Sequence, residues 1–225
     1  MIRQIPSIQL PNYGVGLPGV DEVRRALLWD SVHRAAAATW AGNVQFFTNP
    51  IGSLAGLAGA PKTLLDTNMV SAGQIPARNT FEIWDVRIGV TADLIGVADV
   101  ATVPIALQEY VSDMAYGAAF SLFIDGKTVL DVAPIAILAP GYGITSHGFA
   151  NNFPVAAPAA GGGAMGAQFG SPNGTSLWGL APYPLVIKPS QNFQVQLFFP
   201  NAITIPAVTA SRVWVHFDGV LRKAA

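Results

Sequence analysis

Alternating apolar and polar positions mark several segments of this chain as β-strands. The clearest alternation runs from Phe193 to Phe199, with apolar side chains at 193, 195, 197 and 199 and glutamines at 194 and 196. Successive side chains of a strand point to opposite faces, so a period of two predicts a strand with one buried face. Leu185–Ile187 precedes it, and Pro189 lies in a linking segment suited to a turn. We therefore expect a β-hairpin from Leu185 to Phe199.

A second hairpin is expected between Ala119 and Val132. Asp125-Gly126 separates two apolar-rich segments there, and this pair supplies the positive φ angles of a two-residue turn. Single strands are expected over Asn43–Thr48 and Arg212–Arg222. The chain is therefore rich in short antiparallel strands.

The segment Phe81–Val90 has a strand pattern that changes phase. Phe81 and Ile83 share one face, whereas Trp84, Val86, Ile88 and Val90 share the other. One extra residue in a strand produces such a switch, so we predict a β-bulge here.

Two segments favour helix. Asp21 is a suitable N-cap for a helix from Glu22 towards Ala38, because acidic residues occupy its first turn and alanines fill positions 35–38. Apolar side chains at 107, 110, 111 and 114 have helical spacing within Val103–Tyr116. We expect a helix in the first segment, and the second is ambiguous but has helical spacing.

The remaining segments are rich in glycine, proline and alanine. Residues 1–19 contain three prolines and read as an extended arm, and residues 52–76 read as loop with one helical turn. Residues 139–179 form a long Gly/Ala/Pro segment that we interpret as a loop. The N-terminus lacks the apolar run of a signal peptide, and no transmembrane helix is expected.

Charge is scarce along the whole chain. Hydrophobic residues make up 51% and charged residues 11%, against about 25% charged residues in typical soluble domains. A largely neutral surface suits a subunit whose flanks are covered by neighbours. The net charge is −1, and the only adjacent basic pairs are Arg24-Arg25 and Arg222-Lys223. The sequence therefore indicates no specific nucleic-acid site.

The residue types that carry chemistry do not form a recognisable motif. The absence of cysteine excludes a disulfide framework and a thiolate metal site, and His33, His147 and His216 are far apart in sequence. Serine, histidine and aspartate are all present, but no G-x-S-x-G elbow accompanies them. Turn chemistry accounts for Asp125 and Asp218. We therefore assign no catalytic, cofactor-binding or metal-binding residues.

Two glycine patterns and a set of aromatic residues have weak functional interpretations. Residues 14–19 and 161–166 match G-x-G-x-x-G, but prolines interrupt the strand that a dinucleotide site needs before the first, and the second lies in the Gly/Ala/Pro segment. Strand aromatics more often fill a core or a subunit contact than line a platform for sugars or bases. The aromatic set is Trp84, Phe120, Phe123, Phe193, Phe198, Phe199 and Trp214.

Several short segments together resemble the jelly-roll capsid proteins of tailless icosahedral bacteriophages, some of which contain an internal membrane. The segments are Thr67-Asn68-Met69 with Ala72–Pro76, Lys188–Phe193 ending in Phe199-Pro200, and Asp218–Arg222. The resemblance implies an eight-stranded sandwich, assembly into a shell and no catalytic residues. The Gly/Ala/Pro segment 139–179 departs from it, because it matches no motif of that family.

We therefore expect an all-β fold, a jelly-roll-type β-sandwich with short helices and long loops. Residues 1–42 would form an N-terminal arm and a helix, and residues 43–225 a single jelly-roll domain. The expected function is that of a major capsid subunit in a virion, without enzyme activity or cofactor. Its partners would be copies of itself, other virion proteins and the lipid of an internal membrane. The alternatives are a carbohydrate- or receptor-binding module of spike type and, less favoured, a hydrolase on a β scaffold.

Overall fold

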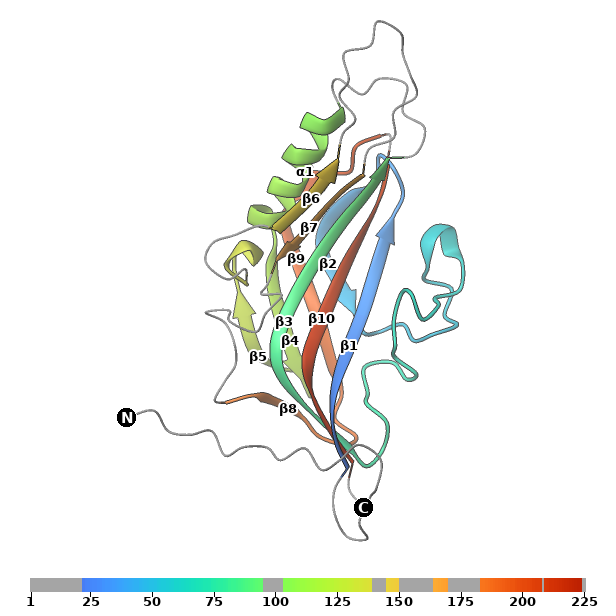
Figure 1. Cartoon of the computed structure of the whole chain (residues 1–225), viewed down its shortest axis with the longest axis vertical. Coiled ribbons are helices and arrows are strands. Elements are labelled where there is room, and N and C mark those ends of the chain that lie inside the picture. Colours follow the sequence, from blue (N-terminus) through green and yellow to red (C-terminus); the bar gives the residue numbers. More distant parts are fainter. Residues whose placement is uncertain are drawn as a thin grey trace, which may run out of the picture.

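Two antiparallel β-sheets pack face to face in the computed structural model, which describes residues 22–94, 103–138, 145–149, 164–169, 183–207 and 209–223 (Figure 1). One sheet, called sheet A, has the strand order β1-β10-β3-β7-β6, with β8 also paired to β3. The other, sheet B, has the order β2-β9-β4-β5. The expected all-β sandwich is thus confirmed.

The strands are β1 Glu22–Arg34, β2 Thr39–Phe46, β3 Asn79–Leu94, β4 Ala119–Ile124, β5 Lys127–Val132, β6 Thr145–Phe149, β7 Ala164–Phe169, β8 Leu185–Ile187, β9 Phe193–Thr204 and β10 Thr209–Lys223. One α-helix, α1, spans Val103–Gly117, and short 3₁₀ turns occupy Leu57–Gly59 and Ile135–Leu138.

One set of strand pairings is nested in the sequence, and the pairings β3–β10, β4–β9 and β6–β7 join this set into the two sheets. β1 pairs with β10, β2 with β9, β3 with β7 and β8, and β4 with β5, all antiparallel. Each pair lies inside the previous one along the chain. The two halves of the chain therefore run together as one long antiparallel ribbon that folds over to make both sheets.

The core lies between the two sheets and follows the alternation of the strands. Phe47 stacks on Phe217 with a ring-centroid distance of 5.1 Å, and Trp40 stacks on Phe199 at 6.0 Å. Phe47, directly after β2, thus contacts β10 of sheet A across the core, whereas Trp40 and Phe199 join β2 to β9 within sheet B. Fully burying one such side chain stabilises the fold by roughly 1.5–3 kcal/mol, so the core supplies the main driving force for folding.

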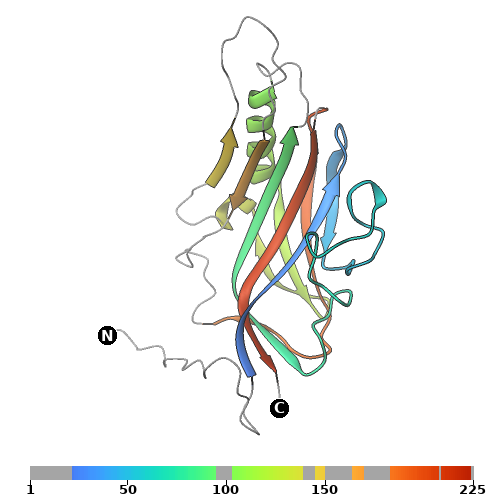
Figure 2. The ribbon, with the colours of Figure 1, turned by 45° about the vertical axis from the view of Figure 1, so that its right-hand side comes forward.

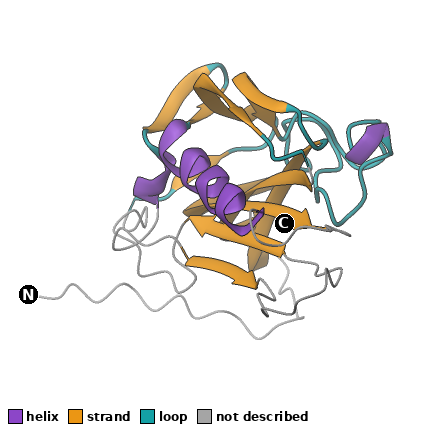
Figure 3. Ribbon diagram, turned by 90° about the horizontal axis from the view of Figure 1, so that it is seen from above, coloured by secondary structure: helices purple, strands orange, loops and turns teal. Residues whose placement is uncertain are grey.

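Helix α1 packs over one end of the sandwich and contacts strands of both sheets (Figure 3). Val111 and Met114 are buried, at the helical spacing expected from the sequence. The Tyr110 hydroxyl accepts a hydrogen bond from Trp40 Nε1 at 2.8 Å and lies 2.5 Å from Ser211 Oγ. Burial raises the pKa of Tyr110 to about 12, despite the two hydrogen bonds. A satisfied polar chain thus links β2, α1 and β10.

The Asp125-Gly126 hairpin and the bulge in β3 are confirmed. Asp125 has φ 51° and Gly126 has φ 74°, the left-handed values of a two-residue turn between β4 and β5. In the ladder between β3 and β10, Asp85 pairs with Asp218 and Ile83 with Gly219, so Trp84 is the extra residue. The helix at 103–117 and the strands at 39–46 and 209–223 also agree with the sequence patterns.

The predicted helix after Asp21 is wrong, because residues 22–34 form β1 along β10. Ala26, Leu28 and Val32 alternate against the core, but the intervening Asp30 is a buried acid and hides the period of two. The alanines that favoured helix form a turn in which Ala38 N donates to Ala35 O at 3.2 Å. The boundary expected after residue 42 falls within β2, so both β1 and β2 belong to the sandwich. The arm at residues 1–19 lies outside the described residues.

The predicted hairpin around Pro189 is also wrong. Ile187 of β8 pairs with Phe81 in sheet A, whereas Phe193 of β9 pairs with Ile124 in sheet B. The segment between them turns through a hydrogen bond from Gln191 N to Lys188 O at 3.2 Å and carries the chain from one sheet to the other. Alternation identified the strands but contains no information about their partners.

The interpretation of residues 139–179 as loop is corrected in part. β6 and β7 lie within this segment and extend sheet A, with β7 paired to residues 88–93 of β3 and β6 paired to β7. Strand pairing uses backbone groups, so small residues with no strand pattern can still extend a ladder. The other residues of this segment, and the first glycine pattern, lie outside the described residues.

Candidate interaction surface

The loop between β2 and β3, residues 47–78, projects beyond the β1 edge of sheet A (Figures 1 and 2). It is called the projecting loop below. Asn68 pairs with the free edge of β1 in both directions: its N–H donates to Trp29 O at 3.2 Å, and its Oδ1 accepts from Trp29 N at 3.0 Å. Asn68 Nδ2 also donates to Leu27 O at 2.7 Å. The loop therefore covers the middle of an edge strand that would otherwise offer unpaired backbone groups.

A buried ion pair fixes the base of the projecting loop. Lys62 Nζ lies 2.5 Å from Asp30 Oδ1, and each side chain is only 1% exposed. The other carboxylate oxygen accepts from Phe47 N at 2.6 Å, where the chain leaves β2. Burial raises the pKa of Asp30, and the Lys62 ammonium and the Phe47 amide oppose that rise. Asp30 thus binds the projecting loop at its first residue, Phe47, and again at Lys62.

A second polar cluster joins the projecting loop to the outer side of sheet A. His33 Nε2 lies 2.8 Å from Asp66 Oδ1, and Arg212 donates to both His33 Nδ1 and Asp66 Oδ1 at 3.2 Å. Because Nδ1 accepts from Arg212, the proton of neutral His33 lies on Nε2 and points to Asp66. The same carboxylate caps the turn at Thr63, accepting from its N–H at 2.8 Å and from its hydroxyl at 2.9 Å.

The pKa directions agree with this geometry. Burial, together with the Arg212 charge, lowers the pKa of His33 against the opposing hydrogen bond to Asp66. Burial alone would raise the pKa of Asp66, but the hydrogen bonds from Thr63 and His33 and the charge of Arg212 lower it. His33 and Asp66 resemble two members of a Ser/His/Asp triad, but no described hydroxyl group bonds to His33. This cluster therefore serves to fasten the loop.

The fastened loop presents large apolar side chains to solvent. Leu54, Leu65 and Val70 are each at least 75% exposed, and Leu64 is 63% exposed. Ile51 on the same loop and Leu27 on the neighbouring strand are also exposed. An exposed apolar group on a firmly anchored support is a feature of protein–protein contact sites. One sequence pattern could have indicated this part of the loop: Thr63-x-x-Asp66 matches a capped turn, and Leu64 and Leu65 lie between these two residues.

The outer face of sheet B carries few charged side chains along its central strands. Phe198 is 46% exposed, and its cross-strand neighbours are Asn43 on β2 and Ala119 on β4. Gln196, two residues before Phe198 on β9 and on the same face, lies between Gln45 of β2 and Ser121 of β4. Of the predicted aromatic set, Phe120, Phe193 and Phe199 are buried in the core, so Phe198 is the member most exposed among the described residues.

Asp218 does not belong to a turn, contrary to the sequence interpretation. It lies inside β10, and its carboxylate binds the Arg25 guanidinium and Arg87 Nη2, the latter at 3.1 Å. Burial alone would raise the pKa of Asp218, but these two arginines lower it. Asp85, also bound to Arg87, has a pKa that burial raises. The group is a strand-to-strand ion-pair network.

The described acidic and histidine side chains do not gather into a metal site. No group of three or more His, Asp or Glu side chains among them could hold a metal ion. His216 stacks on Trp214 with the ring centroids 5.8 Å apart, and burial lowers its pKa; the His147 side chain lies outside the described set. A pocket of about 310 Å³ beside β9, lined by Phe123, Asn192 and their neighbours, has no ionisable side chain. None of the described helices is long and apolar enough to cross a membrane.

The fold and this surface define an antiparallel β-sandwich with an anchored apolar projection. No family model, curated protein or solved structure matches the chain at a significant level.

Proposed function

We propose that this chain is a structural virion protein, a major capsid subunit that assembles with copies of itself into an icosahedral shell. The observation that carries the proposal is the anchored apolar projection. Two buried polar clusters hold a loop that exposes Leu54, Leu64, Leu65 and Val70. Leaving these side chains in water is unfavourable, so the arrangement favours a partner that covers them.

The strand connectivity supports the same proposal. Nested antiparallel pairs that alternate between two sheets are what a jelly roll requires, and jelly rolls are common in viral capsid domains. Fold alone does not define function, because lectin domains share this architecture. The scarcity of charge over the outer face of sheet B adds a second surface suited to lateral packing between subunits.

The proposal places the protein in the virion, without enzyme activity or cofactor. Its main partner is a second copy of the chain, and other virion proteins and the lipid of an internal membrane are further candidates. Each stable subunit contact would bury about 1,600 Å² in total. Because the contact is apolar, it should persist at raised salt, which screens only the charged interactions.

Light scattering and negative-stain microscopy of the purified chain, at low and high salt, test the proposal. The wild-type chain should form large particles at both salt concentrations. The double variant Leu64→Ser/Leu65→Ser should remain folded and shift to small species, because both side chains are exposed in the subunit. The matched control Leu64→Met/Leu65→Met keeps the apolar character and should assemble.

A monodisperse wild-type monomer at micromolar concentration, with other virion proteins supplied, would overturn the capsid proposal. Particles that dissociate at high salt would overturn the apolar account of the contact. Normal assembly of the serine variant would exclude the projecting loop as the contact.

A carbohydrate- or receptor-binding module is the second candidate, favoured by one specific observation. Phe198 is exposed on the outer face of sheet B near amide side chains, and an aromatic ring with neighbouring amides can bind a sugar by stacking and hydrogen bonding. Under this alternative the chain remains a small oligomer and binds a glycan array, and Phe198→Ala abolishes the binding.

A further inference from the structure

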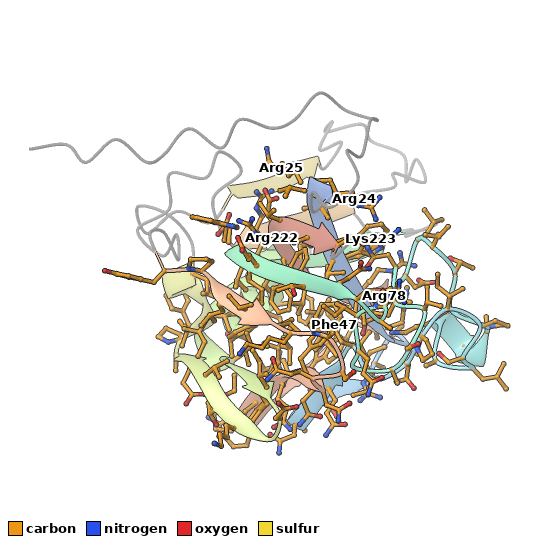
Figure 4. The ribbon with its side chains drawn as sticks, turned by 90° about the horizontal axis from the view of Figure 1, so that it is seen from below. Arg24, Arg25, Phe47, Arg78, Arg222 and Lys223 are labelled. Carbon is orange, nitrogen blue, oxygen red and sulfur yellow. The ribbon has the colours of Figure 1, made fainter. Side chains whose placement is uncertain are left out.

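The two short basic pairs of the sequence meet at one end of the sandwich. Antiparallel pairing of β1 with β10 sets Arg24 opposite Leu221 and Val23 opposite Arg222, so the start of one strand lies beside the end of the other. Asn79, the first residue of β3, pairs with Lys223, and this brings the preceding Arg78 to the same end. Figure 4 shows these side chains over the ends of the three strands. Arg24, Arg25, Arg78, Arg222 and Lys223 are called the basic end below.

Two of these five cations have acidic partners within the sheet. Arg222 binds Glu82 with an Nε–Oε1 distance of 2.5 Å, and Arg25 binds Asp218. Both pairs lie on the outer face of sheet A, because alternate residues of a strand point the same way. These pairs explain why Arg25 and Arg222 are present without invoking a ligand.

The other three cations are exposed and form no ion pair with a described side chain. Arg24 is adjacent to Arg25 in β1, and Lys223 is adjacent to Arg222 in β10. Because successive side chains of a strand point to opposite faces, Arg24 and Lys223 lie on the inner face of sheet A, beyond the end of the core. Arg78 has φ 67°, a left-handed conformation that glycine or asparagine adopts more readily. The described carboxylates at this end, Glu82 and Asp218, are both bound by the outer pair of arginines, so Arg24, Arg78 and Lys223 leave a local excess of positive charge among the described side chains.

Arg24 and Lys223 line a pocket of about 350 Å³ at this end. Its other lining residues are Pro76, Ala77, Asn79 and Leu221. Guanidinium and ammonium groups with a nearby amide form the usual set of donors for a phosphate group. The apolar lining is small or buried, so the pocket lacks the exposed Trp, Phe or Leu side chains that a membrane-inserting surface uses.

We propose that the basic end binds the phosphate backbone of a nucleic acid, with Arg24, Arg78 and Lys223 as the contacts. Recognition is independent of sequence, because the contacts are to phosphates. The site does not depend on assembly: the ladder of β1 with β10 builds it within a single chain. Particle formation and nucleic-acid binding can therefore succeed or fail separately.

Fluorescence anisotropy with a labelled oligothymidylate, measured over a range of salt concentrations, tests the site on the full chain. Three phosphate contacts to a single strand predict a slope of log K against log salt of about −2, and each removed contact reduces the slope by roughly 0.7. Arg24→Gln, Arg78→Gln and Lys223→Gln should each weaken binding, and the triple variant should abolish it. Arg24→Lys retains the charge and should bind.

Arg34→Gln is the matched control, because Arg34 is an exposed arginine at the opposite end of the same strand. It should leave binding unchanged, and melting temperatures should verify that all variants are folded. Failure of the wild-type chain to bind, or equal loss in Arg34→Gln, would overturn the proposal. Binding to phosphatidylglycerol vesicles but not to the oligonucleotide, lost in the same triple variant, would also overturn it and identify a lipid ligand instead.

Discussion

Replacement of Lys62 by methionine is the sharpest test of how the projecting loop is held. Methionine has a similar length and apolar stem, so the change removes the ammonium group with little change in volume. Asp30 would then remain buried at 1% exposure, with its carboxylate bonded to Phe47 N but without a counter-charge. Breaking a buried pair on one side costs about 3–5 kcal/mol.

The expected result at neutral pH is a loss of about 3 kcal/mol in the free energy of unfolding. For a chain of this size, that corresponds to a fall in melting temperature of roughly 6–12 °C. The penalty should shrink towards pH 5. Without Lys62, the pKa of Asp30 in the folded state rises further above its unfolded value, and protonation then removes the uncompensated charge. Chemical denaturation at the two pH values measures both effects.

A double variant separates the charge from the packing. Asp30→Leu/Lys62→Met removes both charges and leaves the Phe47 N–H unpaired, which costs about 1–3 kcal/mol. The double variant should therefore be about as stable as Lys62→Met alone or more stable. The penalties of the single variants Asp30→Leu and Lys62→Met should thus not add. Lys188→Met, at an exposed lysine, is the control and should lie within about 0.5 kcal/mol of wild type.

Hydrogen exchange links this prediction to the interaction surface. The amides of Gly52 and Lys62 donate across the base of the loop, to Lys62 O and Ser53 O respectively, both at 2.8 Å. Both should exchange faster in Lys62→Met, because the anchor is lost. A Lys62→Met chain with wild-type stability, or with a penalty that does not change with pH, would refute the reasoning that Asp30 carries a buried charge there.

Two further predictions concern a glycine and the histidines. Gly219→Ala should cost about 3 kcal/mol or more by denaturant unfolding, because a Cβ there would lie 2.0 Å from Glu82 O. Gly126→Ala, with open space around it, should cost only about 1–2 kcal/mol from its positive φ; equal costs would contradict the close approach. Burial lowers the pKa of His33 and His216 below the usual 6.5, so the unfolded chain binds protons that the folded chain does not. Stability should therefore fall as the pH drops from about 7.5 to about 5.5, and His216→Phe should flatten that dependence in thermal melts; a melting temperature that rises on acidification would contradict it.

The sequence by itself determined the elements whose signals are local. The Asp125-Gly126 turn, the bulge at Trp84 and the alternation of β9 and β10 are all encoded in adjacent residues, whereas the helical spacing at 103–116 left that segment ambiguous. Turn dihedrals, helical spacing and a period of two depend on neighbours along the chain, so these features could be predicted. The scarcity of charge, and the expectation of a β-sandwich that followed from the strands, belong to the same category.

Tertiary structure alone decided which strands are partners, and with them both candidate sites. Residues 22–34 have helical propensity, but pairing along β10 and burial of Asp30 against Lys62 make them a strand. Alternation gave β8 and β9 as strands but could not assign them to different sheets. The leucines of the projecting loop are exposed only because distant residues fasten its base, and the basic end exists only because antiparallel pairing joins the start of β1 to the end of β10. Hydrogen bonding between strands and burial of charge are interactions between residues far apart in sequence, and no local pattern encodes them.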